Sequence, residues 1–247
     1  MHLLAVLEYD GTDFQGFQSQ KKGRTVQDEL ERTLREFLPQ SERRAGRVKI
    51  VGGGRTDAGV HAYGQTATFD LDWTRDLETF RRAWNAKLPT DIFVRRVSKV
   101  PADFSARYSA SSRVYQYRVW NQPERSVFHC RYAYWVAEPL DVSAMQAAAE
   151  HLLGKKDFAA FGSAPDGGST VRDVTRVELH RDAGEIIFTL EANAFLYRMV
   201  RRIVGTLLLV GRGIISSQNI EDVIQRKRRA GFSVPPHGLT LMEIKYE

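Results

Sequence analysis

Four glycines lie within eight residues in the stretch Gly52-Gly-Gly-Arg-Thr-Asp-Ala-Gly59, which also carries one cation, one hydroxyl and one carboxylate. Glycine lets the backbone take positive φ and approach a ligand closely, but it weakens the strand or helix that it interrupts. The stretch follows an apolar run, residues 48–51, that predicts a strand. Because a strand end can hold a reactive side chain on rigid support, Asp57 is the first candidate for catalysis. The alternative is that Asp57 only caps a turn.

Several common chemistries lack their sequence patterns. The chain has no Gly-x-x-x-x-Gly-Lys-Ser/Thr, and the glycines at 52–59 are not spaced Gly-x-Gly-x-x-Gly, so neither common nucleotide-binding loop is supported. One cysteine and six histidines show no two ligands at metal-binding spacing, so we expect no metal. The Gly-x-Ser-x-Gly elbow is also absent, although a Ser-His-Asp set assembled from distant positions stays open.

The charge pattern favours a polyanionic partner. The chain has 247 residues and a formal net charge of +6, and an arginine-rich chain suits phosphate oxygens and bases. The alternative is that each positive cluster is a solvated face. With no signal peptide, no membrane-length apolar run and only Cys130, we expect a cytoplasmic protein without membrane association. The clusters are Arg43, Arg44 and Arg47; Arg81 and Arg82; Arg95 and Arg96; Arg198, Arg201 and Arg202; and Arg226, Lys227, Arg228 and Arg229.

Alternating and amphipathic patterns predict strands and helices in both halves of the chain. Thr25 and Asp141 are placed as N-caps of two of the helices. We expect strands over residues 3–8, 48–51, 64–71, 92–97, 113–120, 174–179, 186–191 and 239–246, and helices over 25–38, 76–88, 141–153 and 193–210.

This element order predicts an α+β fold with two similar halves. The joint lies near residues 100–112, so we assign residues 1–105 to an N-terminal half with the Asp57 loop and residues 106–247 to a C-terminal half. On the strand at 113–120, Tyr115 and Tyr117 share one face because side chains alternate along a strand.

A carboxylate in a glycine-rich loop, aromatic residues and arginines suit chemistry on a nucleobase. Such a base must leave its stack, and it is then held by aromatic stacking and by cations on the flanking phosphates. A carboxylate can act as nucleophile or base, and a nearby arginine would keep it ionised.

Several short motifs follow one another along the whole chain, and the most specific is Gly54-Arg-Thr-Asp-Ala-Gly-Val-His-Ala62. The others are Glu8-Tyr-Asp-Gly-Thr12, Asn85-Ala-Lys-Leu-Pro-Thr-Asp-Ile92, Asp103-Phe-Ser-Ala-Arg107 with Arg113-Val-Tyr-Gln-Tyr117, Asp157-Phe158 with Phe161, Asn193-Ala-Phe195 with Met199-Val-Arg-Arg-Ile-Val-Gly205, and Pro235-Pro-His-Gly-Leu239. In sequence and in order, these motifs resemble those of the tRNA pseudouridine synthase A family.

The resemblance implies an isomerase that converts uridine to pseudouridine at positions 38, 39 and 40, in the anticodon stem-loop of tRNA, without a metal or organic cofactor. Asp57 falls on the family's nucleophile and Tyr115 on the position that stacks against the flipped target base. Arg55 falls on a position that helps to hold the flipped nucleotide, and Arg201 on a basic position near the catalytic acid. For further RNA contacts we expect Arg81, Arg82, Arg198 and Arg202.

The resemblance also implies one extended, mainly antiparallel central sheet flanked by helices, an active-site cleft between the two halves, and a homodimer. The chain departs from the family pattern at four positions, none of them Asp57, Tyr115 or Arg201: tryptophan is usual at Phe17, alanine at Gly53, and histidine at Ser105 and Arg198.

Two other kinds of protein stay open on the residues themselves. A non-catalytic RNA-binding module would share the arginines and aromatics, but an acid in its loop would repel phosphate. A carboxylate-pair glycosidase would need a second acid near Asp57, with Asp70 and Asp103 as candidates.

Overall fold

In the computed structural model, residues 1–40, 46, 48–164 and 167–246 are described, and the chain forms two compact units. Unit 1 contains Met1–Ser111 with Leu241–Glu247, and unit 2 contains Ser112–Thr240. The sequence pattern predicts a division after residue 105 with the whole remainder in the second half, whereas by its contacts the chain divides after Ser111, and Leu241–Glu247 belong to unit 1. Arg43, Arg44 and Arg47 lie outside the described residues.

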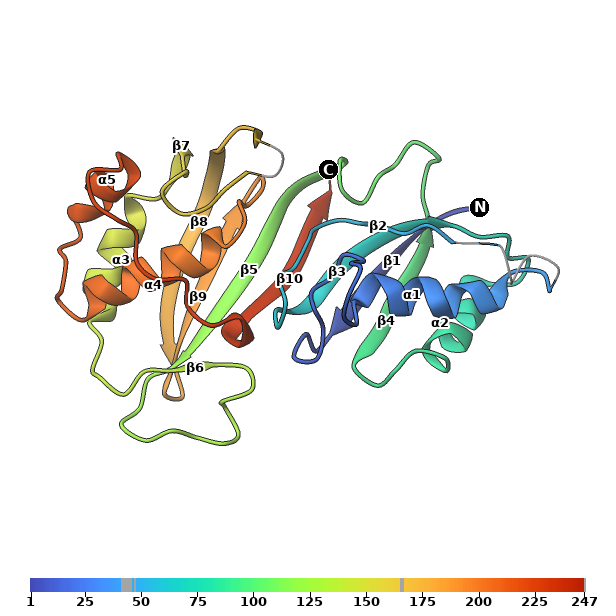
Figure 1. The fold of residues 1–247 in the computed structure, drawn as a ribbon, viewed down its shortest axis with the longest axis horizontal. Coiled ribbons are helices and arrows are strands. Elements are labelled where there is room, and N and C mark those ends of the chain that lie inside the picture. Colours follow the sequence, from blue (N-terminus) through green and yellow to red (C-terminus); the bar gives the residue numbers. More distant parts are fainter. Residues whose placement is uncertain (41–45, 47, 165–166, 247) are drawn as a thin grey trace. The chain divides into compact units, whose positions relative to one another are not determined.

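The sheet of unit 1 has the strand order β4-β1-β3-β10, with β2 also on β3 (Figure 1). Strand β1 pairs antiparallel with both β3 and β4, with a register shift on each side near its end, and β2 pairs antiparallel with β3. The strands are β1 His2–Tyr9, β2 Val51–Gly52, β3 His61–Asp70, β4 Ile92–Lys99 and β10 Leu239–Tyr246.

Two capped helices cover this sheet. In α1 (Val26–Leu34) the Thr25 side chain accepts a hydrogen bond from the Asp28 N–H, and a 3₁₀ turn, Arg35–Phe37, follows the helix. In α2 (Leu77–Asn85) the cap is Asp76. The indole of Trp84 donates to the Thr33 hydroxyl at 2.9 Å, which joins α2 to α1. The rings of Phe69, Phe80 and Trp84 pack together as the aromatic core of the unit.

The sheet of unit 2 has the strand order β5-β9-β8-β7. Strand β5 pairs antiparallel with β9, β9 with β8 and β8 with β7, while the two-residue β6 pairs parallel with β5. The strands are β5 Ala110–Trp120, β6 Tyr134–Trp135, β7 Gly154–Asp157, β8 Val171–Asp182 and β9 Glu185–Ala192.

The helices of unit 2 are α3 (Val142–Glu150), α4 (Met199–Gly211) and α5 (Asn219–Ile224), and a 3₁₀ turn, Pro236–Gly238, precedes β10. Helix α3 packs against α4 and β8, and its cap is Asp141. Most residues of α4 are buried, so this helix forms the centre of the core. Each unit is thus a mainly antiparallel sheet with helices packed against it, which confirms the expected α+β class.

One expected strand is wrong over most of its length. Residues 48–50 are not in a strand, and β2 contains only Val51 and Gly52. The reason is that side chains of α1 bind the backbone of Ile50: its N–H donates to the Glu31 carboxylate, and its carbonyl accepts from Gln27. The apolar run is buried against a helix, which its pattern could not distinguish from burial in a sheet.

The expected helix over 193–210 starts six residues late, at Met199. Arg198 has φ of 62°, a left-handed conformation that cannot continue a helix backwards. The Asn193 side chain accepts the backbone N–H groups of Asp173 and Ala194, and the Tyr197 N–H donates to the Ser163 carbonyl. Local side-chain bonding and a bridge to a distant segment therefore replace the first turns.

Candidate active site

The start of the Asp57 loop, residues 53–60, is fixed by hydrogen bonds to one buried amide side chain, that of Gln65 on β3. Its Oε1 accepts the N–H groups of Gly54 (3.2 Å) and Thr66 (3.1 Å). Its Nε2 donates to the Gly54 carbonyl (2.9 Å) and to the Tyr9 hydroxyl (3.3 Å). An amide has two donors and two acceptor lone pairs, so all of its hydrogen-bonding capacity is used. Since Gln65 is fully buried, these bonds fix the start of the loop in one position.

Tyr9 extends this buried network to the residue before Asp57. Its hydroxyl accepts a hydrogen bond from Gln65 Nε2 at 3.3 Å and shares another with the Thr56 hydroxyl at 2.7 Å. Burial raises the pKa of Tyr9 to about 12, with the bonds to Thr56 and Gln65 acting in the opposite direction. Tyr9 therefore stays neutral at physiological pH.

A second segment, residues 10–17, holds the other side of the loop. The Phe17 N–H donates to the Thr56 carbonyl and the Gly59 N–H donates to the Phe14 carbonyl, each at 3.2 Å. Gly16 has φ of 95°, and a Cβ there would lie only 2.6 Å from the Thr56 carbonyl oxygen. A side chain at Gly16 would therefore push the two segments apart.

Asp57 stands at the start of a turn that Gly59 makes possible. The Val60 N–H donates to the Asp57 carbonyl at 3.1 Å, and Gly59 has φ of 76°. Thr56 is buried, Asp57 is half-buried and Arg55 is exposed. The backbone on both sides of Asp57 is therefore fixed while its side chain keeps access to solvent, which is the geometry that a positioned nucleophile or base requires.

The histidine of the same motif has a structural setting. His61 is 4% exposed, and its Nδ1 accepts the Gly11 N–H at 3.0 Å and lies 3.1 Å from Asp10. Gly11 itself fits only without a side chain, because a Cβ there would lie 2.0 Å from the Val60 carbonyl oxygen. His61 thus joins the end of the loop to the segment that begins at Asp10.

In unit 2 the two tyrosines that share a face of β5 have different surroundings. Tyr117 is fully buried, and its hydroxyl donates to the Pro235 carbonyl at 2.8 Å. Tyr115 is 8% exposed and meets the ring of Phe195 edge-on, with the centroids 5.2 Å apart. Tyr117 is therefore the packing residue of the pair.

Arg201 of α4 connects the helix to the segment before β10. Its Nε donates to the Val234 carbonyl at 2.7 Å. Burial lowers the pKa of His237, and the positive charge of Arg201 lowers it further. Burial raises the pKa of Tyr117, and the same charge opposes this. Arg201 thus adds a positive charge to a small group in unit 2 that includes Tyr117 and His237, where burial is the larger cause of both pKa shifts.

The four arginines expected to bind RNA differ in their bonding. On α2, Arg81 pairs with Glu78 at 2.6 Å, and Arg82 lies 3.3 Å from the same carboxylate. Arg198 stacks over the exposed ring of Tyr197 (4.8 Å from guanidinium carbon to centroid). Arg202 is exposed on α4. The Arg81 charge is partly used within the protein, so α2 is the weaker of the two expected RNA surfaces.

The residues that hold the Asp57 loop, Gln65 and Tyr9, were not singled out from the sequence. The available signal is that β3 is polar at Gln65, Thr66 and Thr68 yet must lie inside a sheet, so these side chains need internal partners. Within the described ranges, no three histidine, cysteine, aspartate or glutamate side chains are grouped to hold a metal ion. In the same ranges no helix has the length and apolar character needed to span a bilayer.

The comparison with protein families gives a match to a model described as tRNA pseudouridine synthase, over residues 5–109 and 148–247. A tRNA pseudouridine synthase A from Halalkalibacterium halodurans is 44% identical over 94% of this chain and 87% of its own. Proteins of the same description from Anoxybacillus flavithermus and Geobacillus kaustophilus are each 42% identical over 98% of this chain, and over 97% and 93% of their own. A solved structure of an archaeal box H/ACA sRNP complex matches with a TM-score of 0.39 and 12% identity over 84% of this chain and 43% of that one, which is too weak to support an argument.

The chain therefore belongs to the tRNA pseudouridine synthase family, whose members are isomerases acting on uridine in tRNA. This excludes both a carboxylate-pair glycosidase and a non-catalytic RNA-binding module.

Proposed function

We propose that this enzyme isomerises uridines 38, 39 and 40 in the anticodon stem-loop of tRNA, with Asp57 as the nucleophile. In this assignment Tyr115 stacks on the flipped uracil, Arg55 holds the flipped nucleotide, and Arg201 acts near the reacting acid. Arg81, Arg82, Arg198 and Arg202 bind RNA, and the enzyme works in the cytoplasm as a homodimer without a cofactor. The substrate positions, the homodimer and the residue roles come from the family resemblance of the sequence motifs.

The reaction conserves every atom of the nucleotide. The Asp57 carboxylate attacks ribose C1′, so an ester bond forms there as the bond to uracil N1 breaks, and the freed uracil rotates so that its C5 faces C1′. The C5–C1′ bond then forms and the carboxylate is released. Carbon 5 loses its proton and N1 gains one, so no redox partner is required. The step that needs a base is this final proton loss from carbon.

The observation that carries the assignment is the way in which the Asp57 loop is built. Gln65 uses all of its hydrogen-bonding capacity on the loop and its neighbours, and Tyr9 and Phe17 bind Thr56 from two sides. A turn that only reverses the chain does not need this number of buried partners. A carboxylate that must meet one atom of a bound nucleotide does, because misplacement of a reacting group by about 1 Å can cost roughly 100-fold in rate.

The test is single-turnover kinetics with tRNA carrying tritium at uracil C5. Each isomerisation releases one C5 hydrogen to water, so tritium release counts events without product separation. Asp57→Asn retains the shape of the side chain and removes its nucleophilicity. Tritium release by the wild type and none by Asp57→Asn, with tRNA affinity preserved, supports the assignment. Release by the variant at more than a hundredth of the wild-type rate contradicts it.

The position within tRNA has its own experiment. Transcripts in which U38, U39 and U40 are replaced singly and together by cytidine are compared for total pseudouridine formed. Loss of all product from the triple replacement supports the anticodon stem-loop, and undiminished product contradicts it. Light scattering at micromolar concentration, with and without tRNA, tests the homodimer separately.

A further inference from the structure

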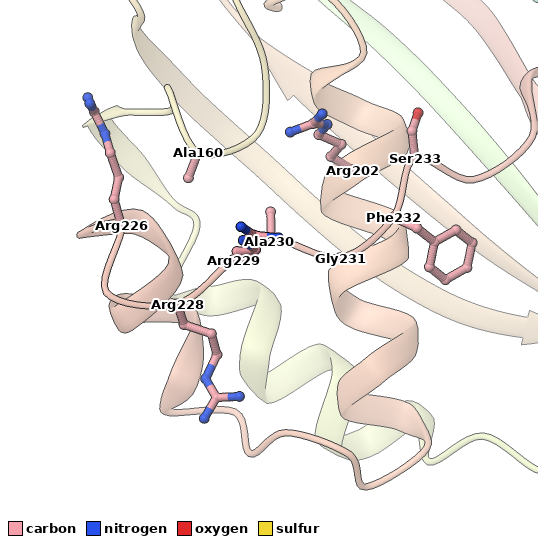
Figure 2. Close-up of a pocket in the computed structure, with 9 residues that line it drawn as sticks. All are labelled: Ala160, Arg202, Arg226, Arg228, Arg229, Ala230, Gly231, Phe232 and Ser233. Carbon is pink, nitrogen blue, oxygen red and sulfur yellow. The ribbon is translucent and has the colours of Figure 1, made fainter.

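Unit 2 contains a pocket of about 460 Å³ whose lining shares only Arg202 with the residues assigned above. It lies between α4 and the segment that follows α5, and Figure 2 shows this segment passing beside the helix. Four of its nine lining residues are arginines, and none of the described lining residues is acidic. The lining consists of Ala160, Arg202, Arg226, Arg228, Arg229, Ala230, Gly231, Phe232 and Ser233.

Three of these positive charges have no counter-ion among the residues that the structure describes. Arg226 forms an ion pair with Asp157 of β7, with the two atoms 2.5 Å apart. Arg202, Arg228 and Arg229 form no ion pair with any residue in the described part of the chain. Concentrating three such charges raises the local positive potential, which an external anion lowers.

The segment that carries the arginines is firmly held. Gly231 N–H donates to the Thr206 hydroxyl of α4 at 2.8 Å. Gly231 and Gly205 permit a close approach of the two backbones: a Cβ on Gly205 would lie 1.9 Å from the Phe232 carbonyl oxygen. At the other end, Arg226 has φ of 61° and ends α5. A held backbone places the arginines along a defined line before any ligand binds, which reduces the entropy lost on binding.

The directions of the arginine side chains indicate whether the pocket suits a small anion or an extended one. In Figure 2, Arg226 and Arg228 leave the segment in opposite directions, Arg202 extends from α4, and Phe232 points away from all of them. A small anion requires donors that converge on one point, and a drug-sized ligand requires a mainly apolar lining. Diverging guanidinium groups on one ridge suit a series of phosphates along a strand.

We infer that this arginine pocket binds successive backbone phosphates of the tRNA substrate and positions the RNA without reading its bases. This inference rests on the proposed function for its ligand. Phosphate contacts of this kind fix the orientation of a nucleic acid and give most of the salt dependence of its binding.

The experiment measures tRNA binding by fluorescence anisotropy between 50 and 200 mM salt for Arg228→Ala/Arg229→Ala. The matched control is Lys155→Ala/Arg176→Ala, which removes the same charge from the exposed surface of β7 and β8, outside the pocket lining. We expect the pocket variant to bind about tenfold more weakly or worse, and its slope of log affinity against log salt to be shallower by about 1 for each lost contact. The control should change both quantities by less than half as much.

Equal losses in the pocket variant and the control would overturn the inference, because they would show only an effect of net charge. Saturable binding of inorganic phosphate that the pocket variant loses, with tRNA affinity intact, would also overturn it in favour of a small anion. If the double variant has a lower melting temperature than the wild type, it is replaced by Arg229→Gln, which removes the charge but keeps a polar side chain. Tritium release by the wild type, measured in parallel, separates this inference from the proposed function. If the wild type releases no tritium, the proposed function is wrong. If it releases tritium and the pocket variant binds tRNA as the wild type does, only the inference about the pocket is wrong.

Discussion

The Asp57 loop of unit 1 and the arginine pocket of unit 2 are both built from irregular, glycine-containing segments, but they are held by opposite means. The loop is held by buried neutral side chains, above all Gln65 and Tyr9. The arginine segment is held by two backbones in close approach at Gly205 and Gly231, with its charged side chains spread outward. A site that must meet one atom needs directional bonds, because these fix orientation. A surface that must meet a line of charges needs only a fixed ridge.

The largest effect is expected at the residue that the loop positions. Asp57→Asn should reduce pseudouridine formation at least 100-fold in single turnover, because the amide is not a nucleophile. The affinity for tRNA should stay within a few fold, since one acid that repels phosphate has been removed. If the rate and the affinity fell together, the loop would be a binding element like the pocket, and the contrast between the two regions would fail.

The next effect separates the two tyrosines of β5. Tyr115→Phe should lower the single-turnover rate about 100-fold with tRNA affinity preserved, if its hydroxyl relays the proton lost from carbon. If stacking alone matters, Tyr115→Phe should retain most activity, and Tyr115→Leu should lose roughly 1 to 3 kcal/mol of stabilisation.

Tyr117→Phe is the matched control for that experiment. It removes only the hydrogen bond to the Pro235 carbonyl, so it should cost about 1 kcal/mol of folding free energy and leave the rate unchanged. Full activity and normal thermal stability in both Tyr115 variants would show that Tyr115 is core. The stacking residue would then be sought at Tyr63, whose half-exposed ring lies 3.8 Å from the Arg95 guanidinium.

A third prediction weakens the support of the loop and leaves Asp57 in place. Gln65→Leu removes the partner of the buried Thr66 N–H and of the partly buried N–H and carbonyl of Gly54, so it should cost about 2 to 4 kcal/mol of folding free energy. We expect the rate constant at saturating tRNA to fall about tenfold or more, with affinity changed little. Gln116→Leu, on β5 in unit 2, is the control, because that amide makes a single long bond of 3.4 Å to Thr189. A variant at Gln65 that lost stability but retained its rate would show that the network only stabilises the fold.

The corresponding test of the pocket acts on its backbone contact. Gly205→Ala places a Cβ 1.9 Å from a backbone oxygen, so it should cost about 2 to 3 kcal/mol and weaken tRNA binding by displacing the arginine segment. Gly211→Ala at the end of the same helix meets the Met145 side chain, which can move, so its cost should be below about 1 kcal/mol. Urea unfolding of the two variants measures the difference, and equal costs would show that the close approach at Gly205 does not hold the segment.

The smallest effect concerns the protonation of Tyr9. Burial raises its pKa from 10.0 to about 12, so above pH 10 the folded chain retains a proton that the unfolded chain has lost. The stability that the neutral Tyr9 hydroxyl contributes is therefore complete below pH 10, and it decreases as the pH rises toward 12. Between pH 9 and pH 11 the loss should be roughly 1.3 kcal/mol. Tyr9→Phe should lose less stability over that interval than the wild type, and parallel urea midpoints for the two proteins would contradict this.

Local patterns predicted much of the fold. Thr25 and Asp141 cap the helices that their positions indicated, because an N-cap depends on neighbouring residues alone. The expected strand at 48–51 and the expected helix start at 193 are wrong because contacts with a distant segment determine the local backbone conformation. Ile50 is bound by side chains of α1, and Tyr197 by the carbonyl of Ser163, and neither partner is visible in the local sequence.

In the candidate site, too, local sequence features could be predicted and contacts between distant segments could not. Asp57 is marked by the glycines around it, and the motifs identify the family, but the roles of Asp57, Tyr115, Arg55 and Arg201 stay predictions. Gln65 could not be identified as the support of the loop, because its partners at Tyr9 and Gly54 are brought to it only by the pairing of β1, β2 and β3. The arginine pocket depends in the same way on the packing of Gly231 against Gly205.

The last strand of the chain imposes an order on synthesis. Residues Leu241 and Ile244 of β10 lie next to Gly53 and Gly54, and the Tyr246 hydroxyl donates to the Ala106 carbonyl, so the floor of the Asp57 loop is completed by residues made after all of unit 2. On the ribosome, unit 2 can finish folding while unit 1 still lacks a strand. During synthesis the arginine-rich unit 2 is therefore complete before the strand that packs against the Asp57 loop, so the loop can reach its folded form only after β10 has been made.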